Sequence, residues 1–279
     1  MEDLPLFSRR LLSLALLLTP LSALAQAAPA HAAEPIRCTV LLDAETGGVV
    51  HRRGSCNQAV YPQSTFKLPL AMMGYDAGIL KDEHDPRWEY QAKFNRSQRE
   101  RKATDPTIWE KDSIVWYSQE ITRRLGKQSF ADYVSRFGYG NRDVSGGPGG
   151  TDGLTEAWLM SSLKISSDQQ ADFMRRFVTG KLPISPDALR RTQAIVPVFE
   201  AADGWIIHGK TGSGSMRNGS GKGDGNRPIG WFVGWAEKDG RKVVFARLLV
   251  DNKRHTDKPI SYTVRDSLIA DLPGLTAGR

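Results

Sequence analysis

The chain has 279 residues and a formal net charge of +7, with 38 lysines and arginines against 31 acidic residues. The basic residues are scattered and form neither a long run nor an alternation with aromatic residues, which favours a solvated basic surface over a nucleic-acid-binding one. The length is sufficient for one large domain, or two entangled lobes, around a sizeable core.

The N-terminus has the pattern of a secretory signal peptide. Two arginines precede an apolar run over residues 11–24, and small residues at 25–27 supply a cleavage point. The apolar run is too short and wrongly flanked for a membrane-spanning helix. We therefore expect residues 1–27 to be removed and residues 28–279 to form a single exported domain without membrane attachment. Ser8-Arg9-Arg10 also fits a twin-arginine signal, so the export route stays open.

The two cysteines, Cys38 and Cys56, flank a predicted hairpin. Strand-like runs over residues 38–42 and 49–51 are joined by the turn signal Glu45-Thr46-Gly47-Gly48. A hairpin centred on Gly47 sets position 38 opposite position 56, and directly opposed strand residues have separations that suit a disulfide. In an oxidising compartment we expect that bridge to form as a structural staple; two free buried thiols are the alternative.

Helix patterns occupy the middle of the chain and strand patterns its two ends. The first predicted helix begins at Ser64 and runs towards Gly74 or Gly78. Further helices are predicted over residues 113–125, 129–137 and 167–180, and from Ser185 onward. Strands are predicted over residues 205–208, 229–236 and 243–250, and a last helix over 261–272. We expect an α/β protein of the α+β type: a mainly antiparallel sheet from both chain ends, flanked by helices, with an all-helical lobe (roughly residues 64–200) inserted.

Ser64-Thr65-Phe66-Lys67 places a hydroxyl and an amine three residues apart at a helix start. Residues i and i+3 share a helix face, so the Lys67 amine can point at the Ser64 hydroxyl and, when neutral, take its proton. The pair alone is weak evidence, because Ser161-Ser162-Leu163-Lys164 fits the same pattern. The motifs downstream of Ser64 distinguish the two copies.

Three such motifs follow in order. Ser113-Ile114-Val115 puts a second hydroxyl near a helix start, Tyr139-Gly140-Asn141 is a tight-turn tripeptide, and Lys210-Thr211-Gly212-Ser213 follows a hydrophobic strand. The glycine in the last motif lets a ligand approach the backbone closely. Taken singly, the three motifs can equally be structural: an N-cap, a turn and a polar strand end.

Together the motifs resemble those of the serine β-lactamases and penicillin-binding enzymes, and most closely the class D β-lactamases, or oxacillinases. The resemblance covers essentially the whole mature chain in the family's order, and it also includes Trp158-Leu159, Leu163-Lys164-Ile165-Ser166 and Gly230-Trp231-Phe232-Val233-Gly234-Trp235. It implies a periplasmic hydrolase of β-lactam antibiotics with its active site between the two lobes. It also assigns Ser161 and Lys164 to a structural stretch.

The motif that begins at Ser113 distinguishes class D from class A and from the transpeptidases. A class A enzyme would have Ser-Asp-Asn there and a downstream glutamate to activate water, and a transpeptidase would have Ser-x-Asn, whereas this chain has the apolar Val115. The resemblance therefore implies that Lys67 itself is the base for both steps, as an N-carboxylated lysine formed with carbon dioxide or bicarbonate. Burial among apolar groups would supply the neutral amine that this reaction needs.

The resemblance also implies a role for each site residue. Ser64 is the nucleophile and carboxylated Lys67 its general base, supported by the indole N–H of Trp158. Backbone N–H groups of Ser64 and Ser213 form an oxyanion hole. Ser113, helped by Lys210, relays a proton to the leaving nitrogen. Thr211 and Lys210 bind the substrate carboxylate. Val115 and Leu159 limit the access of water. No metal is implied, and monomer and homodimer both stay open.

Three features depart from the family's usual pattern. Ser213-Gly214-Ser215 lacks the aromatic residue that many oxacillinases have after Lys-Thr-Gly, which predicts a wider rim and access for bulky cephalosporins. The arginine that binds the substrate carboxylate in many relatives has two candidates here, Arg265 and Arg254. Residues 145–153 are glycine-rich and predict either a mobile surface loop near the site or a plain linker.

Two other functions share these motifs. A penicillin-sensing receptor domain would be acylated on the same serine and stay acylated, but such sensors are normally fused to a membrane-embedded segment. A D,D-peptidase acting on cell-wall peptides is disfavoured by Val115. Substrate preference among penicillins, cephalosporins and carbapenems depends on small changes at the rim, worth a few kcal/mol, and stays open.

Overall fold

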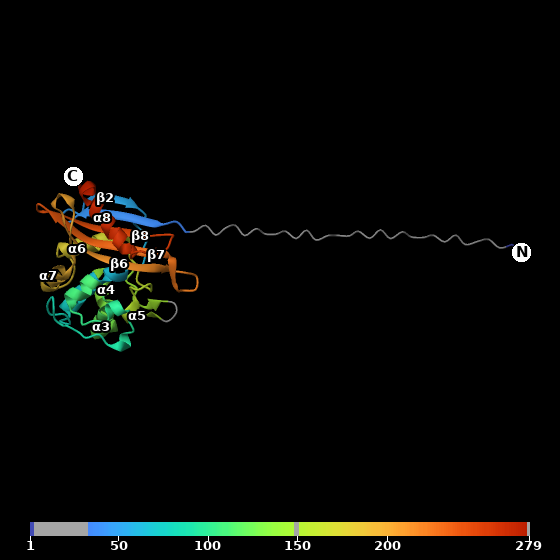
Figure 1. Ribbon diagram of the computed structural model, residues 1–279, viewed down its shortest axis with the longest axis horizontal. Coiled ribbons are helices and arrows are strands. Elements are labelled where there is room, and N and C mark those ends of the chain that lie inside the picture. The colour runs from blue at the N-terminus through green and yellow to red at the C-terminus, as the bar shows by residue number, and fades with distance from the viewer. Residues whose placement is uncertain (3–32, 148–150, 278–279) are drawn as a thin grey trace. The chain divides into compact units, whose positions relative to one another are not determined.

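The computed structural model describes residues 1–2, 33–147 and 151–277, and the fold below is that of residues 33–277 (Figure 1). Most of the predicted signal peptide lies outside the described residues. A single antiparallel sheet forms the centre, in the order β2-β1-β8-β7-β6-β5. Its strands are β1 (Ile36–Asp43), β2 (Val49–Gly54), β5 (Val198–Glu200), β6 (Ile206–Arg217), β7 (Gly223–Lys238) and β8 (Arg241–Val250).

The sheet joins the two ends of the chain, as predicted. β1 pairs with β8 from Ile36 opposite Val250 to Asp43 opposite Val243. In Figure 1 the blue N-terminal strands lie beside the orange C-terminal ones. The α+β expectation is therefore confirmed.

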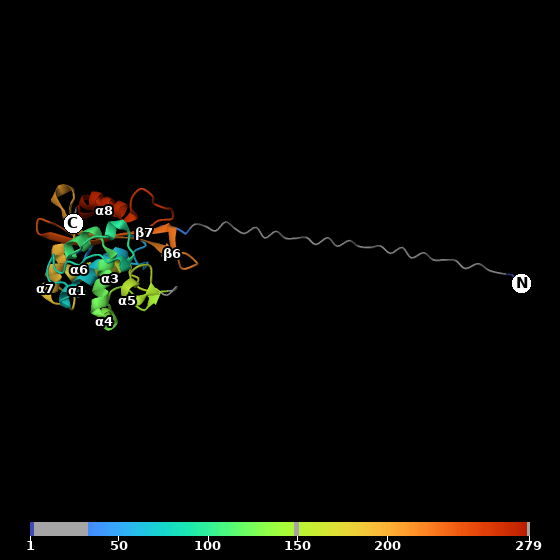
Figure 2. The same cartoon turned by 60° about the horizontal axis from the view of Figure 1, so that its bottom comes forward.

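Helices cover both faces of the sheet (Figure 2). On one face lies α8 (Ile260–Thr276). The other face carries α6 (Ser167–Val178) and the rest of the helical lobe. The other helices of the lobe are α1 (Lys67–Asp76), α2 (Pro106–Asp112), α3 (Val115–Leu125), α4 (Lys127–Phe137), α5 (Gly153–Glu156) and α7 (Pro186–Ile195). Short 3-10 turns are η1 (Gln63–Phe66), η2 (Ala92–Phe94), η3 (Gln98–Glu100) and η4 (Ala202–Gly204).

The alternation of side chains along β7 explains how one sheet serves two cores. Trp231 and Val233 are buried in the larger apolar cluster with the helical lobe, whereas Phe232 is buried in the smaller cluster with α8. Successive strand residues point to opposite faces, so a continuous apolar run fills both sides. The sheet is thereby fixed rigidly between α8 and the lobe that carries the Ser64 motif.

Two of the predicted helix starts are confirmed and a third is not. α6 begins at Ser167 as predicted, with Ser166 as its cap in a capping box with Gln169, and the predicted N-cap Ser185 caps α7 ahead of Pro186. The prediction that Ser129 begins a helix was wrong, because α4 begins at Lys127 directly after Gly126, without a side-chain cap. Packing of the buried face of α4 fixes its start in place of a cap.

The Cys38–Cys56 disulfide is present, with a Cα–Cα distance of 5.0 Å. The predicted hairpin register was wrong, because Cys38 pairs with Gly54 and Cys56 lies beyond the end of β2. Leu42 pairs with Val49, so the turn is centred between Glu45 and Thr46 and not on Gly47, and the register shift between Leu41 and Leu42 recovers only one residue of that difference. The bridge thus ties the residue after the strand back to β1.

Two late strands extend further than the sequence pattern predicted. β6 and β7 stay paired from Ile206 opposite Glu237 to Ser215 opposite Pro228, so the glycine-containing motif at 209–214 continues as strand. Pairing with a buried neighbour outweighs the weak strand propensity of glycine. Residues 146–147 and 151–152 form a two-residue ribbon, β3 with β4, where a loop or linker was expected. In the described part of the chain, no helix is long and apolar enough to cross a bilayer.

Candidate active site

Ser64 lies on η1, a tight turn that leads into α1. Gln63, which precedes it, has a positive φ of 53°, a conformation that costs a non-glycine residue energy and is retained mainly at functional sites. Thr65 fixes the turn: its hydroxyl donates to the Pro62 carbonyl at 2.7 Å and accepts from the Gln170 side-chain amide at 2.9 Å. The backbone that carries Ser64 is therefore held from both sides.

Gly212 brings β6 against this turn. A Cβ at that position would lie 3.0 Å from the Pro62 carbonyl oxygen and 3.0 Å from the Thr65 methyl group. A side chain would push the strand away from the turn, so glycine is needed for the close approach. The approach places Lys210, Thr211 and Ser213 beside Ser64, as the sequence motifs predicted.

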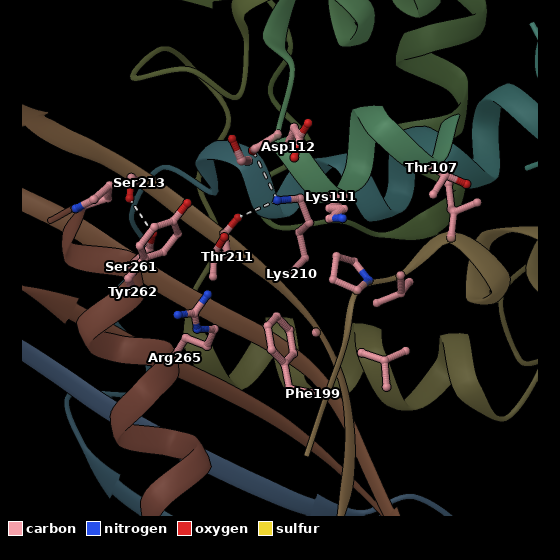
Figure 3. A pocket seen from close by; sticks show the side chains of 18 of the residues that line it. Thr107, Lys111, Asp112, Phe199, Lys210, Thr211, Ser213, Ser261, Tyr262 and Arg265 are labelled. Carbon is pink, nitrogen blue, oxygen red and sulfur yellow. Dashed lines mark hydrogen bonds between the residues drawn. The ribbon is translucent and has the colours of Figure 1, made fainter. Parts of the chain in front are cut away.

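These residues line one cavity of about 680 Å³ between α2, β6 and the start of α8 (Figure 3). The sequence-predicted residues on its wall are Ser64, Ser113, Val115, Lys210, Thr211 and Ser213. A cavity of this size suits a ligand of drug-like dimensions. Trp158 and Lys67 lie behind this wall, almost fully buried at 1% exposure each.

Ser113 occupies the C-cap of α2 in the left-handed conformation, with φ 57°. In this position its hydroxyl accepts a hydrogen bond from Lys210 Nζ at 3.2 Å. Lys210 Nζ also donates to the Thr211 carbonyl at 3.1 Å. The turn between α2 and α3 thus brings the second predicted hydroxyl to the lysine of the third motif.

Lys67 is held by groups that the sequence did not point to. Its Nζ donates to Ser118 Oγ on α3 at 2.9 Å, and it lies 5.8 Å from the ring centroid of Trp109 on α2. The Trp109 indole also donates to Ser118 Oγ, at 2.8 Å. Among the described residues, the hydrogen bond of the Lys67 amine therefore goes to Ser118 and not to Ser64 as predicted.

Burial dominates the electrostatics of the site. It lowers the pKa of Lys67 to about 7, with a further lowering from the nearby Lys210 cation. It likewise lowers the pKa of Lys210 to about 8. Glu110, on α2, is fully buried, and desolvation raises its carboxyl pKa to about 7. Near neutral pH the Lys67 amine therefore has a large neutral fraction and can act as a nucleophile towards carbon dioxide or as a base.

Trp158 packs directly behind the Ser64 turn. Its ring stacks on Phe66 with centroids 5.2 Å apart, and its carbonyl accepts a hydrogen bond from the Gln63 N–H at 3.1 Å. Leu159, the next residue, is half-buried against the same core. The role of the Trp158 indole as a donor to a modified Lys67 stays a prediction.

The Tyr139-Gly140-Asn141 motif supports the turn from outside the cavity. Tyr139 is fully buried, and its ring contacts Phe66 edge-on with centroids 5.3 Å apart. Gly140 has φ 55° and lies so close to Lys164 that a Cβ would be 2.1 Å from the Lys164 carbonyl oxygen. Asn141 accepts from the Lys164 N–H at 3.0 Å, while the Lys164 side chain is exposed. The second Ser-x-x-Lys copy therefore belongs to a structural contact.

The far end of the cavity contains a serine that the motifs did not indicate. Ser261, at the start of α8, is 2% exposed and accepts a hydrogen bond from the Ser213 hydroxyl at 2.6 Å. Only the contact with β6 distinguishes it from any other serine near a helix start. Arg265, one turn later, also lines the cavity and stacks on Tyr262 and Phe199, with centroid distances of 4.7 and 5.3 Å.

The two arginine candidates occupy different places. Arg265 lies on the cavity wall, whereas the guanidinium of Arg254 lies near Gly225 on β7, away from the residues that line this cavity. Over residues 33–147 and 151–277, no group of three His, Cys, Asp or Glu side chains is placed to hold a metal ion. Hydroxyls and cations predominate among the polar groups of the cavity, and the one carboxylate on its wall, Asp112, is paired with Lys102. This set suits an anionic substrate with an acylating carbonyl.

Comparison with known proteins agrees with this arrangement. The family model of the penicillin-binding protein transpeptidase domain matches residues 37–270. Beta-lactamase OXA-9 of Klebsiella pneumoniae is 48% identical over 248 residues, which cover 88% of this chain and 90% of that protein. Beta-lactamase OXA-1 of Escherichia coli is 34% identical over 220 residues, 77% of this chain and 76% of that one.

The fold comparison points to the same group. The crystal structure of OXA-427, a class D β-lactamase, has a TM-score of 0.78 and 41% identity over 85% of this chain and 97% of that chain. The matches cover the sheet, the helical lobe and every motif that lines the cavity. The chain belongs to the penicillin-binding protein transpeptidase family and, within it, to the class D β-lactamases.

Proposed function

We propose that this protein is an exported enzyme that hydrolyses the amide bond of penicillins and related β-lactams through an acyl-enzyme on Ser64, and thereby confers antibiotic resistance. The observation that carries the proposal is the buried Lys67, whose amine pKa is lowered, directly behind a cavity that holds Ser64, Ser113 and Lys210. The disulfide supports export to an oxidising compartment, the periplasm.

Lys67 acts in its N-carboxylated form, made by reaction with carbon dioxide. The surroundings suit that reaction, because the amine is desolvated and partly neutral near neutral pH. Ser118 Oγ, which accepts from Lys67 Nζ, can turn its own hydrogen towards a carboxylated lysine. Trp158, packed behind the turn, is the further donor that we assign to this group.

Acylation begins when Lys67 removes the proton of Ser64 and the Ser64 oxygen attacks the lactam carbonyl. The backbone N–H groups of Ser64 and Ser213 stabilise the oxyanion, a contribution of roughly 3 kcal/mol per donor. The Ser113 hydroxyl passes a proton to the leaving nitrogen. Lys210, which donates to that hydroxyl at 3.2 Å, lowers the cost of the transfer.

Substrate orientation depends on the opposite wall. Thr211, Ser213 and Lys210 bind the substrate carboxylate, and Ser261 extends this set through its contact with Ser213. Arg265 adds a positive potential from the same side. The small residues after Gly212 leave the rim open, which favours bulky cephalosporin side chains.

Deacylation uses the same base. Lys67 activates a water that hydrolyses the Ser64 ester, while Val115 and Leu159 limit the number of waters that reach the site. A penicillin sensor or a D,D-peptidase would complete only the first half of this cycle. Turnover of a chromogenic cephalosporin therefore separates the candidates: many cycles for a β-lactamase, and a single burst for the other two.

The proposed base is tested by pH, bicarbonate and a matched pair of variants. Activity should fall below about pH 7, where the Lys67 amine protonates and carboxylation is lost, and should recover with bicarbonate near neutral pH. Lys67→Ala should lower the turnover number about 10²–10⁴-fold. Lys164→Ala, which changes the exposed lysine of the second Ser-x-x-Lys copy, should leave turnover unchanged. Indifference to bicarbonate, or normal turnover by Lys67→Ala, would overturn the assignment.

A further inference from the structure

Glu110 is a buried carboxyl that the proposed chemistry does not use. It lies on α2 with 0% exposure, and neither of its carboxylate oxygens has a hydrogen-bond partner. A buried acid without a hydrogen bond costs a domain stability, and the large majority of buried side-chain polar atoms have a partner. Its retention at this place therefore calls for a functional reason.

Its helix, α2, passes both catalytic lysines. The preceding residue, Trp109, lies against Lys67, and Ser113, at the C-cap of the helix, accepts a hydrogen bond from Lys210. The charged groups that act on the Glu110 carboxyl are Lys210 on β6 and Lys67 on α1. The site thus contains three buried ionisable groups.

Other elements around α2 contribute little charge at this point. Tyr75 on α1 is a further titratable group near α2; the pKa of its phenol is raised chiefly by burial, and then by the charges of Glu83 and Glu110. On α7 the two arginines pair with Asp187 of that helix, and on α3 Glu120 pairs with Arg123 and Arg124. On η3, Glu100 and Arg99 shift the pKa of Lys67 in opposite directions and pair with each other at 3.8 Å. The charge balance of the buried site is therefore set mainly by Lys67, Lys210 and Glu110.

Carboxylation of Lys67 changes that balance. The amine becomes an anion, so an ionised Glu110 would leave two buried negative charges against the single positive charge of Lys210. Like charges in a poorly solvated site oppose one another strongly, and one of the two anions then takes up a proton. Of the two anions, Glu110 is the one that can take up a proton without loss of the new C–N bond on Lys67.

We propose that Glu110 is the internal proton acceptor for carboxylation of Lys67. The Lys67 Nζ attacks the carbon of carbon dioxide, a C–N bond forms, and the proton that leaves the nitrogen is taken up by the Glu110 carboxylate. Lys67–NH₂, carbon dioxide and Glu110–COO⁻ become Lys67–NH–COO⁻ and Glu110–COOH, so the buried site keeps its net charge. This inference rests on the proposed carboxylation of Lys67.

By thermodynamic linkage, the affinity of the wild-type enzyme for carbon dioxide should then be independent of pH at values above those where Lys67 and Glu110 titrate. Where Lys67 is neutral and Glu110 ionised, the wild-type enzyme releases no net proton when it binds carbon dioxide. Glu110→Gln has no acceptor and releases one. Its affinity for carbon dioxide should therefore rise about tenfold for each unit of pH, while that of the wild-type enzyme stays level.

Infrared difference spectroscopy measures the proton directly. The mature enzyme is loaded with bicarbonate at about pH 8, once with ordinary carbon and once with carbon-13, and the unloaded spectrum is subtracted. We expect a carbamate band that shifts with the isotope and a protonated carboxylic acid band that does not. The acid band should be absent from Glu110→Gln and present in Glu110→Asp and in Glu120→Gln, the control that removes a surface carboxylate.

The outcomes separate the two proposals. An enzyme without any isotope-sensitive carbamate band lacks carboxylated Lys67, and both the mechanism and the role of Glu110 fall. A carbamate band without an acid band leaves the mechanism in place and refutes the role of Glu110. An acid band that persists in Glu110→Gln also refutes it, because the proton is then on another group.

Discussion

Ser118→Ala tests how much the hydrogen bonds around Lys67 contribute to the stability of the fold. Ser118 is fully buried, and its hydroxyl accepts from Lys67 Nζ at 2.9 Å and from the Trp109 indole at 2.8 Å. Alanine keeps the shape of the site but leaves two buried donors without an acceptor. At ~1–2 kcal/mol for each unpaired donor, we expect the free energy of unfolding to fall by about 2–4 kcal/mol.

The assay is urea unfolding of the uncarboxylated enzyme, in buffer free of carbon dioxide at neutral pH, with thermal unfolding as a second measure. A loss of this size should lower the Tm by roughly 5–15 °C in a domain of this length. Ser129→Ala, an exposed serine on α4 that makes no cap hydrogen bond, is the matched control and should change stability by less than about 0.5 kcal/mol. A loss below that limit in Ser118→Ala would refute the reasoning.

A double-mutant cycle assigns the loss to its two donors. Trp109→Phe removes the indole N–H, so Ser118→Ala made in that background should cost about 1–2 kcal/mol less than in the wild-type enzyme. The remaining cost belongs to Lys67. Because the lost acceptor stabilised the protonated amine, the pKa of Lys67 should fall further, and the acid limb of the pH–activity profile should move to lower pH.

Four further outcomes follow from the structure. Gly212→Ala should lower kcat/KM about tenfold or more, because its Cβ meets the Ser64 turn at 3.0 Å, whereas Gly274→Ala on α8, with open space around it, should leave kcat/KM unchanged. Ser261→Ala should raise KM about three- to tenfold with little change in kcat, in steady-state assays with penicillins. Reduction of the Cys38–Cys56 bridge, which spans 18 residues, should lower stability by about 3 kcal/mol in unfolding experiments with and without reductant. In the folded enzyme the pKa values of Lys67 and Lys210 are lowered to about 7 and about 8, so between about pH 7 and pH 10 the unfolded chain holds more protons at these lysines than the folded one. The free energy of unfolding should therefore rise with pH over that window, by up to ~1.4 kcal/mol per pH unit for each lysine, and Lys67→Met should reduce the slope.

The motifs and the fold class could be predicted from the sequence because they depend on local patterns. Continuous apolar runs identify β7 and β8, and Ser64, Ser113 and Lys210 each lie in a short motif whose order in the chain matches that of a known family. Ser118 and Glu110 have no such signal. A serine in the middle of α3 and a glutamate on α2 become informative only when those helices pack against α1 and β6.

Register and strand length could not be predicted for a related reason. The register around the Cys38–Cys56 bridge depends on the centre of the turn, which lies between Glu45 and Thr46, and on a bulge at Leu41 and Leu42, and the apolar pattern of the hairpin shows neither. The continuation of β6 through Gly212 depends on its partner β7, not on its own residues. In both cases a tertiary contact decides between local conformations of similar energy.

Lys210 links the binding of substrate to the state of Lys67. Its positive charge lowers the pKa of Lys67, which favours the neutral amine, and it also attracts the anion that carboxylation creates. A bound substrate carboxylate neutralises part of that charge and weakens both effects. We therefore expect Lys67 to be carboxylated in the free enzyme, before substrate enters. An enzyme that loses its carbon dioxide during turnover should then recover slowly while substrate occupies the site, and bicarbonate added before the substrate should protect activity better than bicarbonate added after it.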